Sequence, residues 1–151
     1  MKIHKESLLP ITLTLLFLAG CVSSARDRVC LRRTCFDVEV VRNEWDRMRG
    51  LQFRKSLGPR EGMLFIHRQE GQHTYWMKNM RLPLDIIWLN MKRHVVHVER
   101  NVPPCEDEPC PTYSSPEVAF YVLEVPAGQA KVLGIKRGQT LQFHLQDFSK
   151  D

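Results

Sequence analysis

The residues best suited to chemistry lie in one short stretch that reads YWMKNMRLPLD. A lysine, an amide and a carboxylate, Lys78, Asn79 and Asp85, follow there closely after the aromatic Trp76. Such a set could line a polar binding pocket with an aromatic wall. The alternative is that Asp85 holds a turn between two strands, because a carboxylate beside so apolar a run needs hydrogen-bond donors. The spacing alone does not make these residues a catalytic set.

Other signatures of catalysis or cofactor binding are weak. His94 and His97 are an odd number of positions apart in an expected strand, so they point to opposite faces and do not predict a metal site. The chain has no nucleophile elbow, phosphate loop or dinucleotide fingerprint, and we expect no cofactor. A general base would have to be Asp85 or Glu99, but nothing sets their separation. The catalytic residues, if there are any, stay unknown at this point.

The first twenty residues have the pattern of an export signal. The run Leu8–Ala19 is apolar but short for a membrane span, which predicts a signal peptide. It ends in Leu18–Cys21, which resembles a bacterial lipobox, so we expect cleavage before Cys21 and acylation (palmitate) on that residue. The alternative is a secretory signal cut after Ala25. Val22 follows the cysteine, which by resemblance points to an outer-membrane lipoprotein that faces the periplasm.

The net charge of the chain excludes few classes of binding partner. The formal net charge is +5, and removing residues 1–20 takes away Lys2, Lys5 and Glu6, so the mature chain carries +4. This excess could favour anionic lipids or polymers, or be an ordinary solvated surface. A basic stripe with interleaved aromatic residues is missing, so nucleic acid is not an expected partner.

Four cysteines remain after Cys21, and they form two pairs with the same spacing: Cys30 with Cys35, and Cys105 with Cys110. An even number in an exported protein predicts two disulfides, and local pairing is the simplest of three connectivities. A four-thiolate zinc site is the less favoured alternative.

Alternating and apolar runs predict six or so short strands, over residues 36–41, 62–66, 86–89, 94–102, 119–125 and 140–145. Asn43 can cap a helix over 44–49 that ends before Gly50, with Trp45, Met48 and Leu51 facing inward. A second short helix is expected over 129–133. This pattern predicts an α+β fold with a small curled or barrel-like, mainly antiparallel sheet and two short helices. We expect a signal peptide over 1–20, a lipidated tether over 21–35 and one β-rich domain over 36–148.

Several segments in a fixed order resemble the bacterial and archaeal family called domain of unknown function 192. They are Arg49–Arg54, Glu61–Phe65, Trp76–Asn79 with Pro83–Ile87, Asn101–Cys105, Cys110–Ser115, Leu123–Gly128 and Gly134–Gly138. The resemblance covers about residues 36–145 and leaves out the Cys30 and Cys35 pair. It implies a compact β-rich domain, often exported or membrane-linked, and implies no established activity.

We therefore expect a non-enzymatic, lipid-anchored binding or interaction module of the cell envelope. Its binding groove would lie between the Trp76–Asp85 loop and the Cys105–Ser115 loop. Trp76 and Tyr113 would stack on a small ligand or envelope polymer, and polar contacts would come from the rest of the set: Lys78, Asn79, Asp85, Glu99, Ser114 and Ser115. One alternative is an envelope hydrolase with Asp85 or Glu99 as general base and Lys78 as electrostatic stabiliser. Another is that the motif is only a folding signature and that binding occurs elsewhere.

Overall fold

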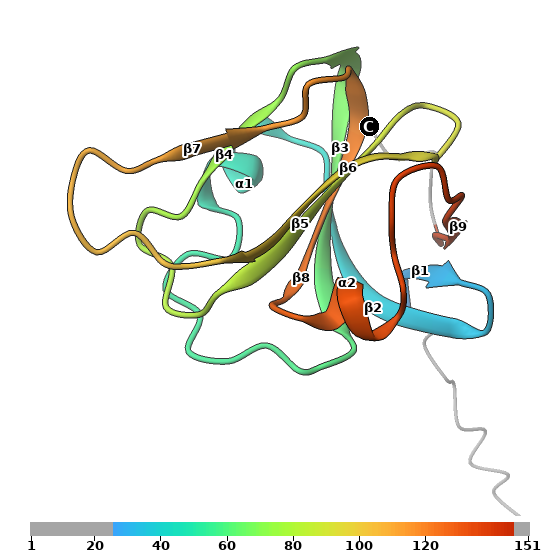
Figure 1. Ribbon diagram of the computed structural model, residues 1–151, viewed down its shortest axis with the longest axis horizontal. Helices are drawn as coiled ribbons and strands as arrows, with labels where there is room; N and C mark the ends of the chain where they lie inside the picture. The colour runs from blue at the N-terminus through green and yellow to red at the C-terminus, as the bar shows by residue number, and fades with distance from the viewer. Residues whose placement is uncertain (1–25, 147–151) are drawn as a thin grey trace, which may run out of the picture.

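A computed structural model describes residues 26–146, which form a seven-stranded sheet, a separate two-stranded sheet and two short helices (Figure 1). The large sheet has the strand order β6-β5-β8-β3-β2-β1-β9, and the small one pairs β4 with β7. The elements along the chain are β1 (Arg28–Leu31), β2 (Thr34–Val41), α1 (Glu44–Arg49), β3 (Glu61–Gly71), β4 (Thr74–Trp76), β5 (Leu84–Leu89), β6 (Val95–Val102), β7 (Thr112–Ser114), β8 (Ala119–Pro126), α2 (Gln129–Val132) and β9 (Gln142–His144).

The large sheet is mainly antiparallel and strongly curled. Only β2 and β3 run parallel, and the connection between them contains α1, as a parallel pair requires a crossover. The two ends of the sheet approach each other, because an isolated bridge joins His94 to Thr140 and the Val95 amide donates to the Gln139 carbonyl at 2.8 Å. The expected α+β fold with a curled, barrel-like sheet is confirmed.

The two faces of the sheet carry separate hydrophobic clusters. Strand β5 is buried at all six positions, because its alternate side chains enter one cluster or the other. Leu64 and Leu123 belong to the inner cluster, which also takes in α2. Phe65 and Trp88 belong to the outer cluster, which β4, β7 and the segment after α1 cover. In Figure 1 this covering layer lies to the left of the sheet, opposite β1 and β9.

The folded domain starts earlier than the sequence indicated. Residues of the expected tether form β1, which pairs with β2 on one side and with β9 on the other. The disulfide between Cys30 and Cys35 joins the facing residues of the β1–β2 hairpin. The boundary predicted at residue 36 is therefore wrong, because the strand on the N-terminal side of the hairpin completes the sheet. Cys21 and the expected signal peptide lie outside the described residues.

Helix α1 has the predicted bounds but not the predicted orientation. Asn43 caps it by accepting from the Asp46 amide at 2.9 Å. Leu51 is buried as expected, whereas Trp45 and Met48 are exposed and no residue of the helix is buried. Arg47 takes the face towards the sheet, since its guanidinium donates to the carbonyls of Arg42 and Ile66. This contact turns the apolar side chains towards solvent.

No helix within residues 26–146 has the length and apolar character needed to cross a membrane.

Candidate functional site

The carboxylate of Asp85 holds two distant segments of backbone together. It lies on β5, fully buried, and faces the inner cluster at the end where α2 packs. Its Oδ1 accepts from the Asn101 amide at 2.9 Å and its Oδ2 from the Ala130 amide at 2.8 Å. Because both oxygens are used and water does not reach them, Asp85 cannot act as a general base in this fold.

The need for this carboxylate comes from the helix that it meets. Gly128, the residue before α2, has no side chain to cap the free amides of the first turn. Asp85 supplies the missing acceptor from a different strand. The interpretation of Asp85 as a residue that holds a turn is thus the better one, although the turn belongs to α2.

Glu99 does not lie with Asp85. It pairs with Ile86 across β5 and β6, which puts its side chain on the face opposite to Asp85. There Glu99 is half-exposed and lies 3.3 Å from His97 Nε2. The two carboxylates required by paired acid–base chemistry therefore occupy opposite faces of the sheet.

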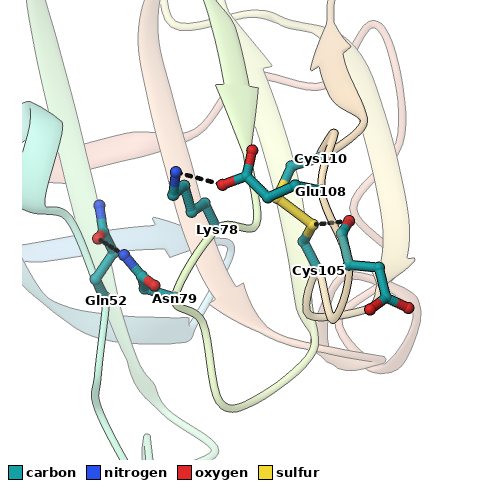
Figure 2. A network of polar contacts seen from close by, with 7 residues as sticks. Gln52, Lys78, Asn79, Cys105, Glu108 and Cys110 are labelled. Carbon is teal, nitrogen blue, oxygen red and sulfur yellow. Dashed lines mark hydrogen bonds and ion pairs between the residues drawn. A yellow bond between two sulfur atoms is a disulfide. The ribbon is translucent and has the colours of Figure 1, made fainter.

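Lys78 links the end of β4 to the loop that the disulfide between Cys105 and Cys110 closes. Its ammonium forms an ion pair with Glu108, which lies in the loop closed by the disulfide between Cys105 and Cys110 (Figure 2). The same ammonium lies 5.5 Å from the centre of the Trp76 ring, within the range of a cation–π contact. Lys78 thus links the indole and the acidic loop. Since both cysteine pairs are local, all four thiols are used without a shared zinc site.

Asn79 points the other way, towards the segment after α1. Its Nδ2 donates to Gln52 Oε1 at 3.1 Å, as Figure 2 shows, and its carbonyl accepts from the Phe53 amide at 2.9 Å. Its φ of +59° is in the left-handed region, which asparagine tolerates better than most residues. Asn79 therefore fixes a turn.

The expected groove between the two loops is occupied by β-sheet pairing. Strands β4 and β7 pair directly, with Tyr75 opposite Tyr113 and Trp76 opposite Thr112. Tyr113 packs on the outer cluster, and Ser115 is buried with its Oγ accepting from a backbone amide at 3.1 Å. Ser114 is exposed at the edge of the pair. The predicted site residues therefore mostly serve the fold, and Trp76 also lines a hollow.

This hollow, of about 440 Å³, lies beside α1 and β4. Its lining consists of Glu44, Arg47 and Met48 from α1, His67 from β3 and the run Gln72–Trp76. None of these residues comes from the Cys105–Ser115 loop. Because Met48 was expected in the core, α1 was not expected to form a wall of this hollow. Arg47, which lies between the two apolar residues of so short a helix, was the signal that could have indicated it.

The floor of the hollow is made of stacked and hydrogen-bonded rings. The His67 and His73 rings are parallel with centres 3.4 Å apart, and His67 Nε2 lies 3.0 Å from the Tyr75 hydroxyl. Burial lowers the pKa of His67 to about 3, and electrostatic interactions with His73 and Arg47 add to the shift. Burial also raises the pKa of Tyr75 well above its ordinary value, with Glu124 adding to the rise. The His67 imidazole and the Tyr75 phenol are therefore both uncharged near neutral pH.

A buried acid, Glu124, lies behind this floor. It belongs to β8, is only 5% exposed and faces the outer cluster between its pairing partners Met63 and Ile86. Burial raises its pKa to about 8. Glu124 was not among the expected site residues, although a glutamate inside so apolar a strand was a signal. At neutral pH this side chain is mostly protonated.

Within the part of the chain that the structure describes, no three histidine, cysteine, aspartate or glutamate side chains lie close enough together to hold a metal ion.

The fold and the site can be compared with known proteins. The model of a family described as DUF192, "Uncharacterized ACR", matches residues 28–143, which include the Cys30 and Cys35 pair. The chain is similar to a crystal structure of a protein of unknown function from Novosphingobium aromaticivorans DSM 12444, with 32% identity, a TM-score of 0.70 and coverage of 78% of this chain and 83% of that one. It is also similar to a proposed transcription regulator from Sinorhizobium meliloti 1021, with 30% identity, a TM-score of 0.70 and coverage of 78% and 92%. No curated protein matches.

Proposed function

The chain belongs to the DUF192 family, and because that family has no assigned activity, we propose its function from the geometry: a lipid-anchored, non-enzymatic binding module of the cell envelope. We place its binding surface on the α1–β4 face, which we define by the exposed side chains of Trp45, Met48 and Trp76. We infer outer-membrane anchoring through Cys21, with the domain in the periplasm.

The exposure of apolar side chains on this face is the observation that carries the binding role. Trp45 is 81% exposed, Met48 62% and Trp76 50%. Trp45 and Met48 are three positions apart, so they share one side of α1, and Met48 and Trp76 line the same hollow. Gathered apolar and aromatic residues on a surface are typical of interaction sites, whereas single ones are ordinary.

The disulfides support the proposed compartment. Both described cysteine pairs are bonded, and such bonds persist in oxidising, exported environments. The apolar run before Cys21 and the lipobox-like tetrapeptide are the reasons to expect export and acylation.

The positions of the acidic residues argue against the hydrolase alternative. Asp85 is buried with both oxygens occupied, and Glu99 lies on the opposite face of the sheet. Lys78, its expected electrostatic partner, is paired with Glu108 instead. A binding role therefore agrees better with this geometry than acid–base catalysis does.

Two measurements test this proposal. The first compares the full chain with Cys21→Ser in bacterial cells: we expect the native chain in the membrane fraction with an acylated Cys21, and the variant released into the periplasm. A native chain without lipid would overturn the anchor.

The second measures binding of residues 22–151, exported and purified, to washed envelopes from the same cells. We expect saturable binding that Met48→Ser or Trp76→Ala weakens. Val132→Ser is the matched control, because Val132 is an exposed apolar residue on α2. Equal binding by all of these chains would overturn the α1–β4 face as the binding surface.

A further inference from the structure

The side chains that line the hollow beside α1 and β4 indicate which class of ligand it binds. We propose that it is a binding site for an uncharged, hydroxyl-rich saccharide, such as a segment of an envelope glycan. This inference rests on the proposed binding function and deepens it by naming the ligand class. With about 440 Å³, the hollow falls within the ordinary range of small-ligand sites.

An aromatic platform forms its rim. One half of the Trp76 surface is exposed, and the ammonium of Lys78, 5.5 Å from the ring centre, helps to hold the indole in place. The face of an aromatic ring is electronegative, and the C–H bonds on one side of a sugar ring carry partial positive charge because of their neighbouring oxygens. A sugar ring can therefore stack on Trp76, with the exposed Met48 adding apolar contact.

Three polar side chains around this platform have unused hydrogen-bonding capacity. Glu44, Gln72 and Thr74 line the hollow and are exposed, and within residues 26–146 none of them forms a side-chain hydrogen bond or ion pair. They offer a carboxylate, an amide and a hydroxyl, which together can both donate to and accept from sugar hydroxyls. Free polar groups beside an aromatic face are the arrangement that a ring with one apolar side and polar edges requires.

The carboxylate and the guanidinium of the lining balance each other. Glu44 is negative and Arg47 positive, and Arg47 already donates to two backbone carbonyls. Burial keeps the ring of His67 uncharged at neutral pH by lowering its pKa to about 3. The positive excess of the chain is thus not concentrated in the lining, and an anionic polymer or lipid surface would gain little there.

The floor is also held in place before any ligand binds. The His67 and His73 rings stack, and Trp88 Nε1 donates to the His73 carbonyl at 3.0 Å. His73 Nε2 lies 3.1 Å from the Gln69 carbonyl, and this contact fixes the second ring. A preorganised floor lowers the entropy cost of binding a weak, polar ligand.

The test is a calorimetric titration of residues 22–151 with the β-1,4-linked tetramer of N-acetylglucosamine, up to roughly 10 mM. We expect saturable binding, about tenfold weaker in Trp76→Ala, where the stacking surface is lost, and less affected in Trp76→Phe. Glu44→Ala should also weaken binding; it changes an exposed residue of α1 and so keeps the test valid if Trp76→Ala does not fold.

The matched control is Val132→Ser, because Val132 is an exposed apolar residue of α2 that does not line the hollow. It should bind the tetramer like the native chain. No saturation by the native chain, or an equal loss in Val132→Ser and Trp76→Ala, would overturn the saccharide site.

The two proposals can fail separately. If the chain binds envelopes through the α1–β4 face but not the tetramer, the saccharide site is wrong and the binding module stands. If it instead binds phosphatidylglycerol vesicles with the same dependence on Trp76, the ligand class is wrong. If it binds the tetramer and releases shorter fragments, the saccharide site stands and the non-enzymatic role falls.

Discussion

The carboxylate of Asp85 accepts a hydrogen bond from the Ala130 amide at 2.8 Å, across 45 positions of sequence. This contact caps a helix whose own cap residue, Gly128, has no side chain, and it joins the end of β5 to α2. Its partner bond to Asn101 extends the link to the end of β6. One buried side chain thus holds three segments at the same end of the sheet.

Replacing Asp85 should destabilise the protein strongly. In Asp85→Ala the amides of Asn101 and Ala130 lose their acceptor, and hydrogen bonds to a charged group are worth about 1.5–3 kcal/mol each. We expect a loss of about 3 kcal/mol or more in the free energy of unfolding, measured by urea denaturation. Glu99→Ala, which removes a half-exposed carboxylate, should cost much less. Similar stabilities of the two variants would contradict the capping role.

Glu124 should make stability depend on pH in the opposite direction from an ordinary carboxylate. Burial raises its pKa from 4.5 to about 8, so the folded state holds a proton that the unfolded state releases above pH 4.5. Its contribution to stability is therefore complete below pH 4.5 and is lost as pH rises to about 8.

The measurement is urea unfolding of the native chain and Glu124→Gln between pH 4.5 and 9. The amide stays neutral, so the variant should gain stability relative to the native chain as pH rises, and the difference should level off near pH 8. A difference that is independent of pH would show that Glu124 ionises normally.

His67 should make the stability of the protein depend on pH in the acidic range. Its folded pKa of about 3 lies below the ordinary value of 6.5, so below pH 6.5 the unfolded state takes up a proton that the folded state does not. The stability that depends on His67 is complete above pH 6.5 and declines as pH falls towards 3.

Thermal unfolding of the native chain and His67→Gln across pH 3.5–7.5 checks this. The variant should lose less stability on acidification than the native chain does. His144→Gln, at an exposed position of β9, serves as the control and should follow the native chain. Parallel curves for all three proteins would contradict a neutral His67.

The disulfide between Cys105 and Cys110 should contribute more to the free energy of unfolding than the ion pair between Lys78 and Glu108 does. Closing a loop of six residues is worth about 2 kcal/mol in the chain-entropy model. The pair of Lys78 with Glu108 is partly exposed and should be worth less than about 1 kcal/mol.

Urea unfolding of Cys105→Ser/Cys110→Ser and of Lys78→Met measures both contributions. The double variant should lose more stability than the lysine variant. If Lys78→Met costs as much, the ion pair rather than the covalent link holds the loop.

Local signals in the sequence determined several elements. The cap at Asn43 and Gly50 beyond the last turn predicted the bounds of α1, because capping acts within a few residues. The apolar run after Asp85 predicted a strand buried on both faces, and the equal cysteine spacings made local pairing the simplest choice. The resemblance added the family, and the strand pattern added the curled, mainly antiparallel sheet.

The tertiary structure alone decided which residues meet. Whether Asp85 served a pocket or a turn depended on the amides of Asn101 and Ala130, which only the folded sheet brings to it. The orientation of Met48 depended on the contact of Arg47 with β3, and the pairing of β4 with β7 occupied the groove that the two loops were expected to form. Periodicity and capping are properties of neighbours along the chain, whereas the face that a side chain occupies and the donor that it finds are set by contacts between distant segments.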